Sequence, residues 1–170
     1  MNHSYDAAEE SDEPAPTGEI SASRQSVIRD FLASADAMAA ALAADDLGKF
    51  NLVSEPVMNQ TSALTAVLES LNISNEKLAT LNNARHFHGS DTLGEARSRF
   101  LKFTMAATDA LTPLRRMKGF PDMQVWQCPM VSKAVPDAED KGRWIQIGGR
   151  PIQNPFFGAE MLDCGQQLNP

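Results

Sequence analysis

Two short sulfur motifs near the C-terminus carry the residues best suited to chemistry. The first is Cys128-Pro129-Met130, and the second runs from Met161 to Cys164. They hold the only two cysteines among 170 residues, each with a methionine close by. On a strand, Cys128 and Met130 would share one face, and on a helical turn Met161 and Cys164 would do the same. Brought together, these faces would form a thiolate and thioether pocket, the ligand set that favours Cu(I) over harder ions.

Two other interpretations of the same residues stay open. A disulfide between Cys128 and Cys164 would close a loop of about 36 residues and stabilise the fold by about 3–4 kcal/mol on a chain-entropy estimate. Such bonds belong to oxidising compartments such as the periplasm. Alternatively, the cysteines are buried free thiols, and Met130 and Met161 only fill the core, as methionine usually does. A switch between a metal-bound dithiol and the disulfide also fits.

A pair of histidines forms a second candidate cluster. His86 and His88 share a face if their segment is extended, and imidazole is a common metal ligand. We therefore include them as supplementary ligands or as a second site for a divalent ion. No Asp, Glu or Cys spacing completes that site, so loop histidines that cap or solvate a helix end are the simpler interpretation.

Composition and charge exclude several classes of function. A hydrophobic content of 42% and a charged content of 22% are typical of a globular domain. The net charge of −7 argues against nucleic acid and against anionic membrane surfaces. No apolar run is long enough to span a bilayer, so we expect no direct membrane insertion.

The chain also lacks the common catalytic signatures. It has no Gly-rich phosphate loop, no metalloprotease helix motif and no Gly-x-Ser-x-Gly elbow. A nucleophile pair of Cys128 with His86 or His88 is conceivable, but no spacing rule brings these residues together. We therefore expect that the protein is not an enzyme.

The elements that must position the sulfur motifs are mainly helical. Apolar residues at three- and four-residue spacing predict helices over about 21–44, 47–71, 74–85 and 91–116. Pro56 should kink or divide the second of these helices. Ser90 or Asp91 should cap the fourth, with Glu95 as its capping-box partner.

The pattern changes after residue 120. Residues 123–128 and 144–147 alternate between apolar and polar, which predicts two strands. Residues 154–158, Asn-Pro-Phe-Phe-Gly, predict a rigid turn that positions Met161 and Cys164. We therefore expect a mainly α fold: an antiparallel bundle of about four helices with a small C-terminal β-ribbon and an irregular, sulfur-rich closing segment.

Residues 1–20 differ in composition from the rest of the chain. They are acidic, contain proline and glycine and offer almost nothing to bury, which predicts a disordered leader or linker. Residues 21–170 are then a single helical domain. The leader has no apolar segment typical of a secretory signal, so the protein is cytoplasmic or the export signal lies upstream.

The C-terminal third also carries a recognisable series of motifs. They are Cys128-Pro129-Met130, Trp144-Ile145-Gln146, Asn154-Pro155-Phe156-Phe157-Gly158 and Met161-Leu162-Asp163-Cys164-Gly165, with a looser match at Arg97-x-x-Phe100. This series resembles a bacterial domain family of unknown function. Its members often follow the periplasmic adaptor (membrane fusion) subunit of copper/silver efflux pumps, or occur as small exported proteins. Relatives often carry His or Tyr where this chain has Gln127.

The resemblance implies a periplasmic helical domain linked to heavy-metal export, with Cys128, Met130, Met161 and Cys164 as the metal ligands. We expect the chain to bind Cu(I) or Ag(I) as an accessory or terminal domain of an efflux system and to hand the ion to a pump or adaptor component. Residues 1–20 would then be a linker from a larger adaptor. The alternative is a disulfide-stapled interaction module of the same assembly that binds no metal itself.

Overall fold

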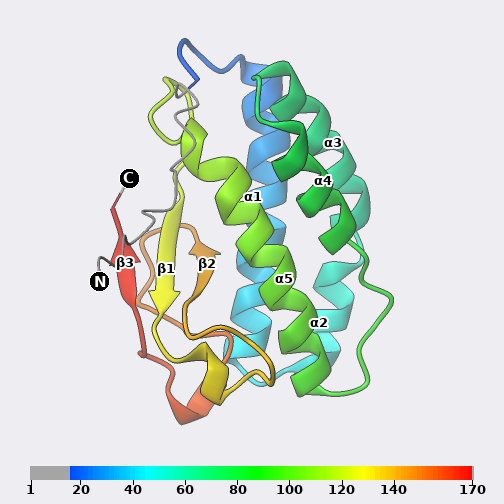
Figure 1. The fold of residues 1–170 in the computed structure, drawn as a ribbon, viewed down its shortest axis with the longest axis vertical. Helices are drawn as coiled ribbons and strands as arrows, with labels where there is room; N and C mark the ends of the chain where they lie inside the picture. The colour runs from blue at the N-terminus through cyan, green and yellow to red at the C-terminus, as the bar shows by residue number, and fades with distance from the viewer. Residues whose placement is uncertain (1–15, 170) are drawn as a thin grey trace, which may run out of the picture.

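The computed structural model describes residues 16–169, and it is mainly helical with a small antiparallel sheet (Figure 1). This confirms the mainly α class expected from the sequence. Most of the leader, residues 1–15, lies outside the described residues. The elements are α1 (Ala22–Ala43), α2 (Leu47–Ser54), α3 (Val57–Ser70), α4 (Asn75–Ala84), α5 (Leu93–Leu111), β1 (Gln124–Cys128), β2 (Gly142–Gln146) and β3 (Gln166–Leu168), with short 3-10 turns at Thr112–Leu114, Val131–Lys133 and Gly158–Glu160.

The helices form one layer and the sheet forms another (Figure 1). Helix α1 packs against α2, α3 and α5, and it also contacts β2. Its buried face includes Ile28, Phe31, Ala35 and Met38, a three- and four-residue spacing that matches the apolar stripe in the sequence. None of the helices in the described part of the chain is both long and apolar enough to cross a membrane.

The second predicted helix is two helices, so the described residues contain five helices rather than about four. Helix α2 ends at Ser54 and α3 begins at Val57, with Pro56 between them in the N-cap position. Proline has no backbone N–H and its ring collides with the preceding turn, which ends one helix but suits the start of the next.

The cap of α5 was also predicted one or two residues too early. Thr92, rather than Ser90 or Asp91, accepts the 3.1 Å hydrogen bond from the Glu95 N–H, and the Glu95 carboxylate accepts one from the Asp91 N–H at 3.1 Å. At its other end, α5 stops at Leu111 instead of continuing to about residue 116, because a 3-10 turn that contains a proline follows it.

The sheet has the order β2-β1-β3, with both pairings antiparallel. The predicted ribbon corresponds to β1 and β2, in which Trp126 lies directly opposite Trp144. The third strand was not predicted from the sequence. At the other end of the chain, Ile20 is buried and its N–H donates a 2.9 Å hydrogen bond to the Lys118 carbonyl, so this residue of the predicted leader packs on the core.

Candidate dithiol site

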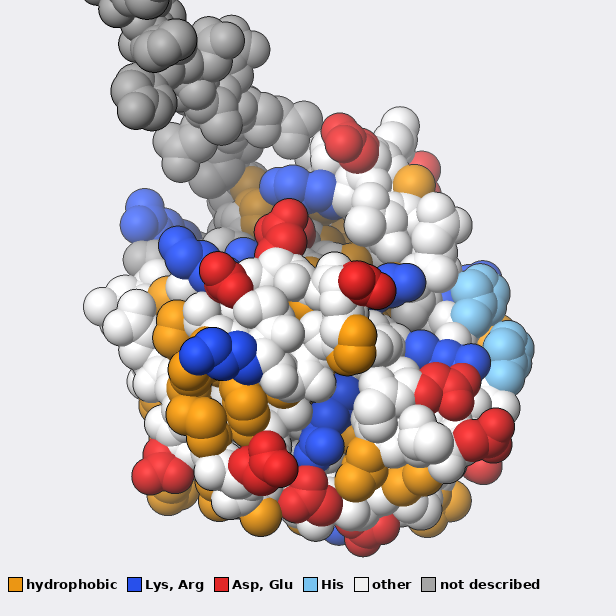
Figure 2. All heavy atoms as spheres, turned by 60° about the horizontal axis from the view of Figure 1, so that its bottom comes forward, with side chains coloured by type: hydrophobic (Ala, Val, Ile, Leu, Met, Phe, Trp, Pro, Cys, Tyr) orange, Lys and Arg blue, Asp and Glu red, His pale blue; other side chains and the backbone are white. Residues whose placement is uncertain are grey.

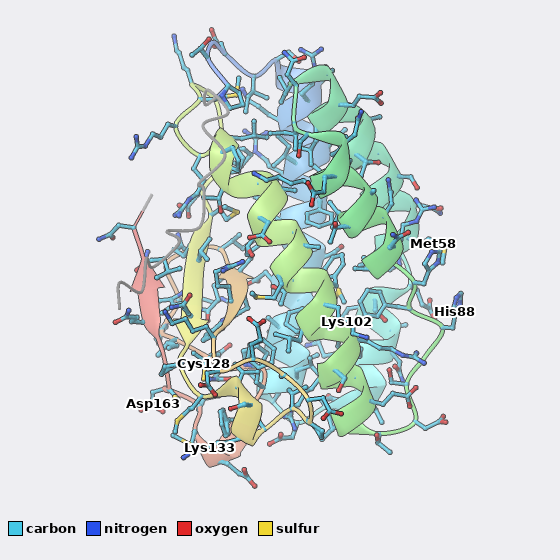
Figure 3. All side chains as sticks on the ribbon, in the orientation of Figure 1. Met58, His88, Lys102, Cys128, Lys133 and Asp163 are labelled. Carbon is cyan, nitrogen blue, oxygen red and sulfur yellow. The ribbon has the colours of Figure 1, made fainter. Side chains whose placement is uncertain are left out.

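The fold brings the two cysteines together. Cys128 is the last residue of β1 and is fully buried, whereas Cys164 lies just before β3 and is half-buried. Because β3 pairs antiparallel with β1, with Gln127 opposite Gln166, the start of β3 lies beside the end of β1. Both thiols are free, and their Sγ atoms lie 3.6 Å apart. Figure 3 shows Cys128 at this end of the sheet, with Asp163 below it.

Gly165 allows the chain to approach this closely. Its φ of 144° lies in the region that favours glycine, and a Cβ there would stand only 2.9 Å from the Gln127 carbonyl oxygen and 3.1 Å from the Trp144 ring. The chain therefore passes over β1 with no room for a side chain, which places Cys164 next to the end of the strand.

Asn154 fixes the segment that carries Cys164. This side chain is fully buried. Its Nδ2 donates a 2.8 Å hydrogen bond to the Cys164 carbonyl, and its Oδ1 accepts hydrogen bonds from the Phe156 and Phe157 N–H groups at 2.8 and 3.2 Å. Its own N–H donates to the Leu162 carbonyl at 2.7 Å. One amide thus joins the turn after residue 154 to the cysteine ten residues later.

A buried tryptophan forms one wall of the site. Trp144 is fully buried, and its ring packs edge-on against Phe156 at a centroid distance of 6.0 Å. Its Nε1 donates a 3.0 Å hydrogen bond to Gln146 Oε1, which also accepts one from the Gln153 N–H at 3.0 Å. Because this indole lies against Gly165, its fluorescence can report on the neighbouring thiol.

Arg97 connects the loop that follows Asn154 to the helical layer. Its guanidinium donates to the Pro155 carbonyl at 2.8 Å, to the Leu42 carbonyl at 2.9 Å and to Asp45 Oδ1 at 2.6 Å. The other oxygen of Asp45 accepts a 3.1 Å hydrogen bond from the Ala159 N–H. These bonds hold the pKa of Asp45 below its ordinary value, with the Arg97 hydrogen bond as the largest cause.

Sequence reasoning did not identify the part that Asp45 plays in holding this loop. The signal that could have found it is its position directly after a helix, where an aspartate tolerates the left-handed conformation it adopts here, with φ of 55°. Gln146, buried within β2, was assigned only to the strand and the motif series.

The methionines of the two motifs differ in burial. Met130 is half-buried and packs against the core, whereas Met161 is 39% exposed. Within residues 16–169, no hydrogen bond joins either methionine sulfur to a thiol. Within the same residues, no group of three or more His, Cys, Asp and Glu side chains could hold a metal ion. The two thiols are the donors whose close approach the structure records, and the thioether ligands stay a prediction.

No family model, no curated protein and no solved structure matches this chain. The resemblance to the efflux-associated family rests on the motifs alone. The efflux role, its partners and the periplasmic location therefore stay predictions.

The environment of Cys164 favours its neutral thiol. Burial raises the pKa of the Cys164 thiol above its ordinary value of 9.0, and the hydrogen bond and charge repulsion from Cys128 raise it further. A metal ion must therefore displace the proton of Cys164, which the folded protein holds more firmly than an ordinary thiol is held, and binding should tighten as pH rises.

The raised pKa predicts how the stability of the reduced protein depends on pH. The folded state favours the neutral thiol, so this contribution is complete below the ordinary thiol pKa and is lost as pH rises through the higher folded value. We expect the free energy of unfolding of the reduced protein to fall more steeply above pH 9 than that of Cys164→Ser. Urea unfolding between pH 7 and 10.5 measures this, and parallel curves for the two proteins would contradict it.

The histidine pair lies elsewhere. His86 and His88 are both exposed, on the coil between α4 and α5, and their rings stack with centroids 6.0 Å apart. They do share a face, as the spacing suggested. Figure 3 places His88 at the opposite edge of the molecule from Cys128, so the histidines do not supplement the dithiol.

Proposed function

We propose that this chain binds a soft monovalent ion, Cu(I) or Ag(I), between Cys128 and Cys164. The observation that supports this most directly is the 3.6 Å separation of two free thiols. Metal–sulfur bonds of about 2.3 Å, the length found in zinc–thiolate sites, would bridge that separation at an angle of roughly 100°, close to a tetrahedral angle, and an ion held in line by the two thiolates alone would need the Sγ atoms to move about 1 Å further apart. Thiolates select Cu(I) and similar ions over hard cations.

The unequal exposure of the two thiols suits capture and release. Cys128 is fully buried, and its thiolate would anchor the ion where water cannot compete. Cys164 is half-buried, and exposed Met161 lies three residues before it. An incoming sulfur ligand of a partner could displace Cys164 first and take the ion in steps, with no bond-making on any substrate.

The motif resemblance extends the proposal to a biological setting. The chain would act as an accessory or terminal domain of a periplasmic heavy-metal efflux system and would pass its ion to a pump or adaptor component. The finer fold belongs to the same proposal: an antiparallel helical bundle supports the ribbon, and the sulfur-rich segment closes over it.

The closeness of the two Sγ atoms also supports a second candidate function. A disulfide needs an Sγ–Sγ distance of about 2.05 Å, so a shift of roughly 1.5 Å would close the bond and staple the C-terminal segment to β1. The chain would then be a disulfide-stapled interaction module of the efflux assembly that binds no metal.

Anaerobic titration with Cu(I) against a competing chelator tests the proposal. We expect the reduced protein to bind one ion tightly and to quench the fluorescence of Trp144, which adjoins the site. The matched variant Cys128→Ser/Cys164→Ser should lose at least a hundredfold in affinity, because hydroxyls are poor ligands for soft ions. Equal affinities of the two proteins would refute metal binding at this site and leave the disulfide module as the better explanation.

A further inference from the structure

The two exposed histidines form a cluster that the proposed function does not use. The rings of His86 and His88 lie 6.0 Å apart between centroids, and their planes differ by only 21°. Figure 2 shows them side by side on the surface. Their distance from Cys128 in Figure 3 makes them a site separate from the dithiol.

The segment that carries the histidines is anchored in the core. Phe87, the residue between them, packs edge-on against Phe50 and Phe103 at centroid distances of 6.0 and 5.4 Å. Asn51 fixes the segment a few residues later, because its side chain donates to the Ser90 carbonyl and accepts from the Ser90 N–H, both at 2.9 Å. With the central residue turned inward, the two imidazoles project outward together before any ligand arrives.

The spacing of the rings suits one ion held between them. Metal–nitrogen bonds of about 2.1 Å, with about 1.2 Å from each nitrogen to its ring centre, put the centroids of two imidazoles in line roughly 6.5 Å apart. The observed 6.0 Å is about 0.5 Å shorter, so the rings need to rotate and separate slightly to aim one nitrogen of each at the same point.

The small donor set decides the class of ion. In the part of the chain that the structure describes, no third His, Cys, Asp or Glu side chain joins the pair. Zn(II) and similar divalent ions take about four ligands, whereas Cu(I) and Ag(I) are stable with two.

We propose that His86 and His88 together bind one Cu(I) or Ag(I) ion, at a second site that works without the cysteines. This differs from the divalent ion that the histidine spacing suggested, because the structure supplies no further ligand. A two-imidazole site should bind more weakly than the dithiol and exchange its ion faster, since both side chains are exposed and an imidazole ligand lacks the negative charge of a thiolate.

The test is titration with silver nitrate in chloride-free buffer, followed by NMR of the imidazole nitrogens. The starting protein is Cys128→Ser/Cys164→Ser/His3→Gln, which keeps only His86 and His88 of the three histidines. Because this protein lacks both thiols, its result does not depend on the dithiol proposal. We expect one equivalent of Ag(I) to shift both imidazoles together.

Single substitutions then separate a shared site from two independent ligands. His86→Gln and His88→Gln should each lower Ag(I) affinity at least tenfold, and both should fold normally because the side chains are exposed. If each variant binds Ag(I) as tightly as the parent, the histidines act singly and the proposal is wrong. Tighter binding of Zn(II) than of Ag(I) by the parent would also overturn it.

Discussion

Asn154→Ala is expected to lower the free energy of unfolding of the reduced protein by about 3–4 kcal/mol, because each buried group left without a partner costs roughly 1–3 kcal/mol. The substitution deprives the buried Phe156 and Phe157 N–H groups of their acceptor, and the Cys164 carbonyl of its donor. Urea unfolding in the presence of reductant measures the loss. Without the hydrogen bond from Asn154, the segment that carries Cys164 should move more freely, and Cys164 should also react faster with a thiol reagent.

Neighbouring substitutions show whether the hydrogen bonds are the cause. Gln153→Ala changes the adjacent residue, whose backbone N–H rather than its side chain makes the local hydrogen bond, and it should cost less than about 0.5 kcal/mol. If Asn154→Ala destabilises no more than Gln153→Ala, Asn154 does not organise the site.

The helices could be predicted from the sequence because their signals are local. The stripe that contains Phe31, Leu32 and Met38 gave α1 almost to the residue, and Pro56 marked the point where one predicted helix becomes two. The sequence allowed either a kink or a division at Pro56. The structure shows a division, so the number of helices is five rather than about four in the described residues. Helix ends were less accurate, because Ser90, Asp91 and Thr92 are all good caps and only the packed chain selects among them.

The third strand and the site depend on contacts between distant residues. Strand β3 has only three residues, two exposed glutamines and the half-buried Leu168, too few to show an alternating pattern, and it pairs with the free edge of β1. The meeting of Cys128 with Cys164 was expected from the motif pattern. Two side chains help to hold them there. Asp45 lies on the helical layer, far from Ala159 in the sequence, and the buried amide of Gln146 accepts a hydrogen bond from a backbone N–H. No local spacing in the sequence reveals either contact.

Gly158→Ala should be the other strongly destabilising substitution, by about 3–4 kcal/mol. Gly158 has a φ of 57°, which costs an L-residue roughly 1–2 kcal/mol. A Cβ there would also stand 2.1 Å from Asp45 Oδ1 and 2.7 Å from Arg97 Nη2, so the ion pair that holds the loop to the helical layer would have to separate. Thermal or urea unfolding of the reduced protein measures the effect.

Gly148 provides the matched control, because it has a similar φ of 78° but nothing within 4 Å of its Cβ position. Gly148→Ala should therefore show the backbone cost alone, about 1–2 kcal/mol. In an Asp45→Ala background the collision with the carboxylate disappears, and the cost of Gly158→Ala should fall towards that of Gly148→Ala. An unchanged cost in that background would mean that Gly158 is required for its backbone conformation only, and that the Arg97–Asp45 pair does not depend on the close approach of the loop.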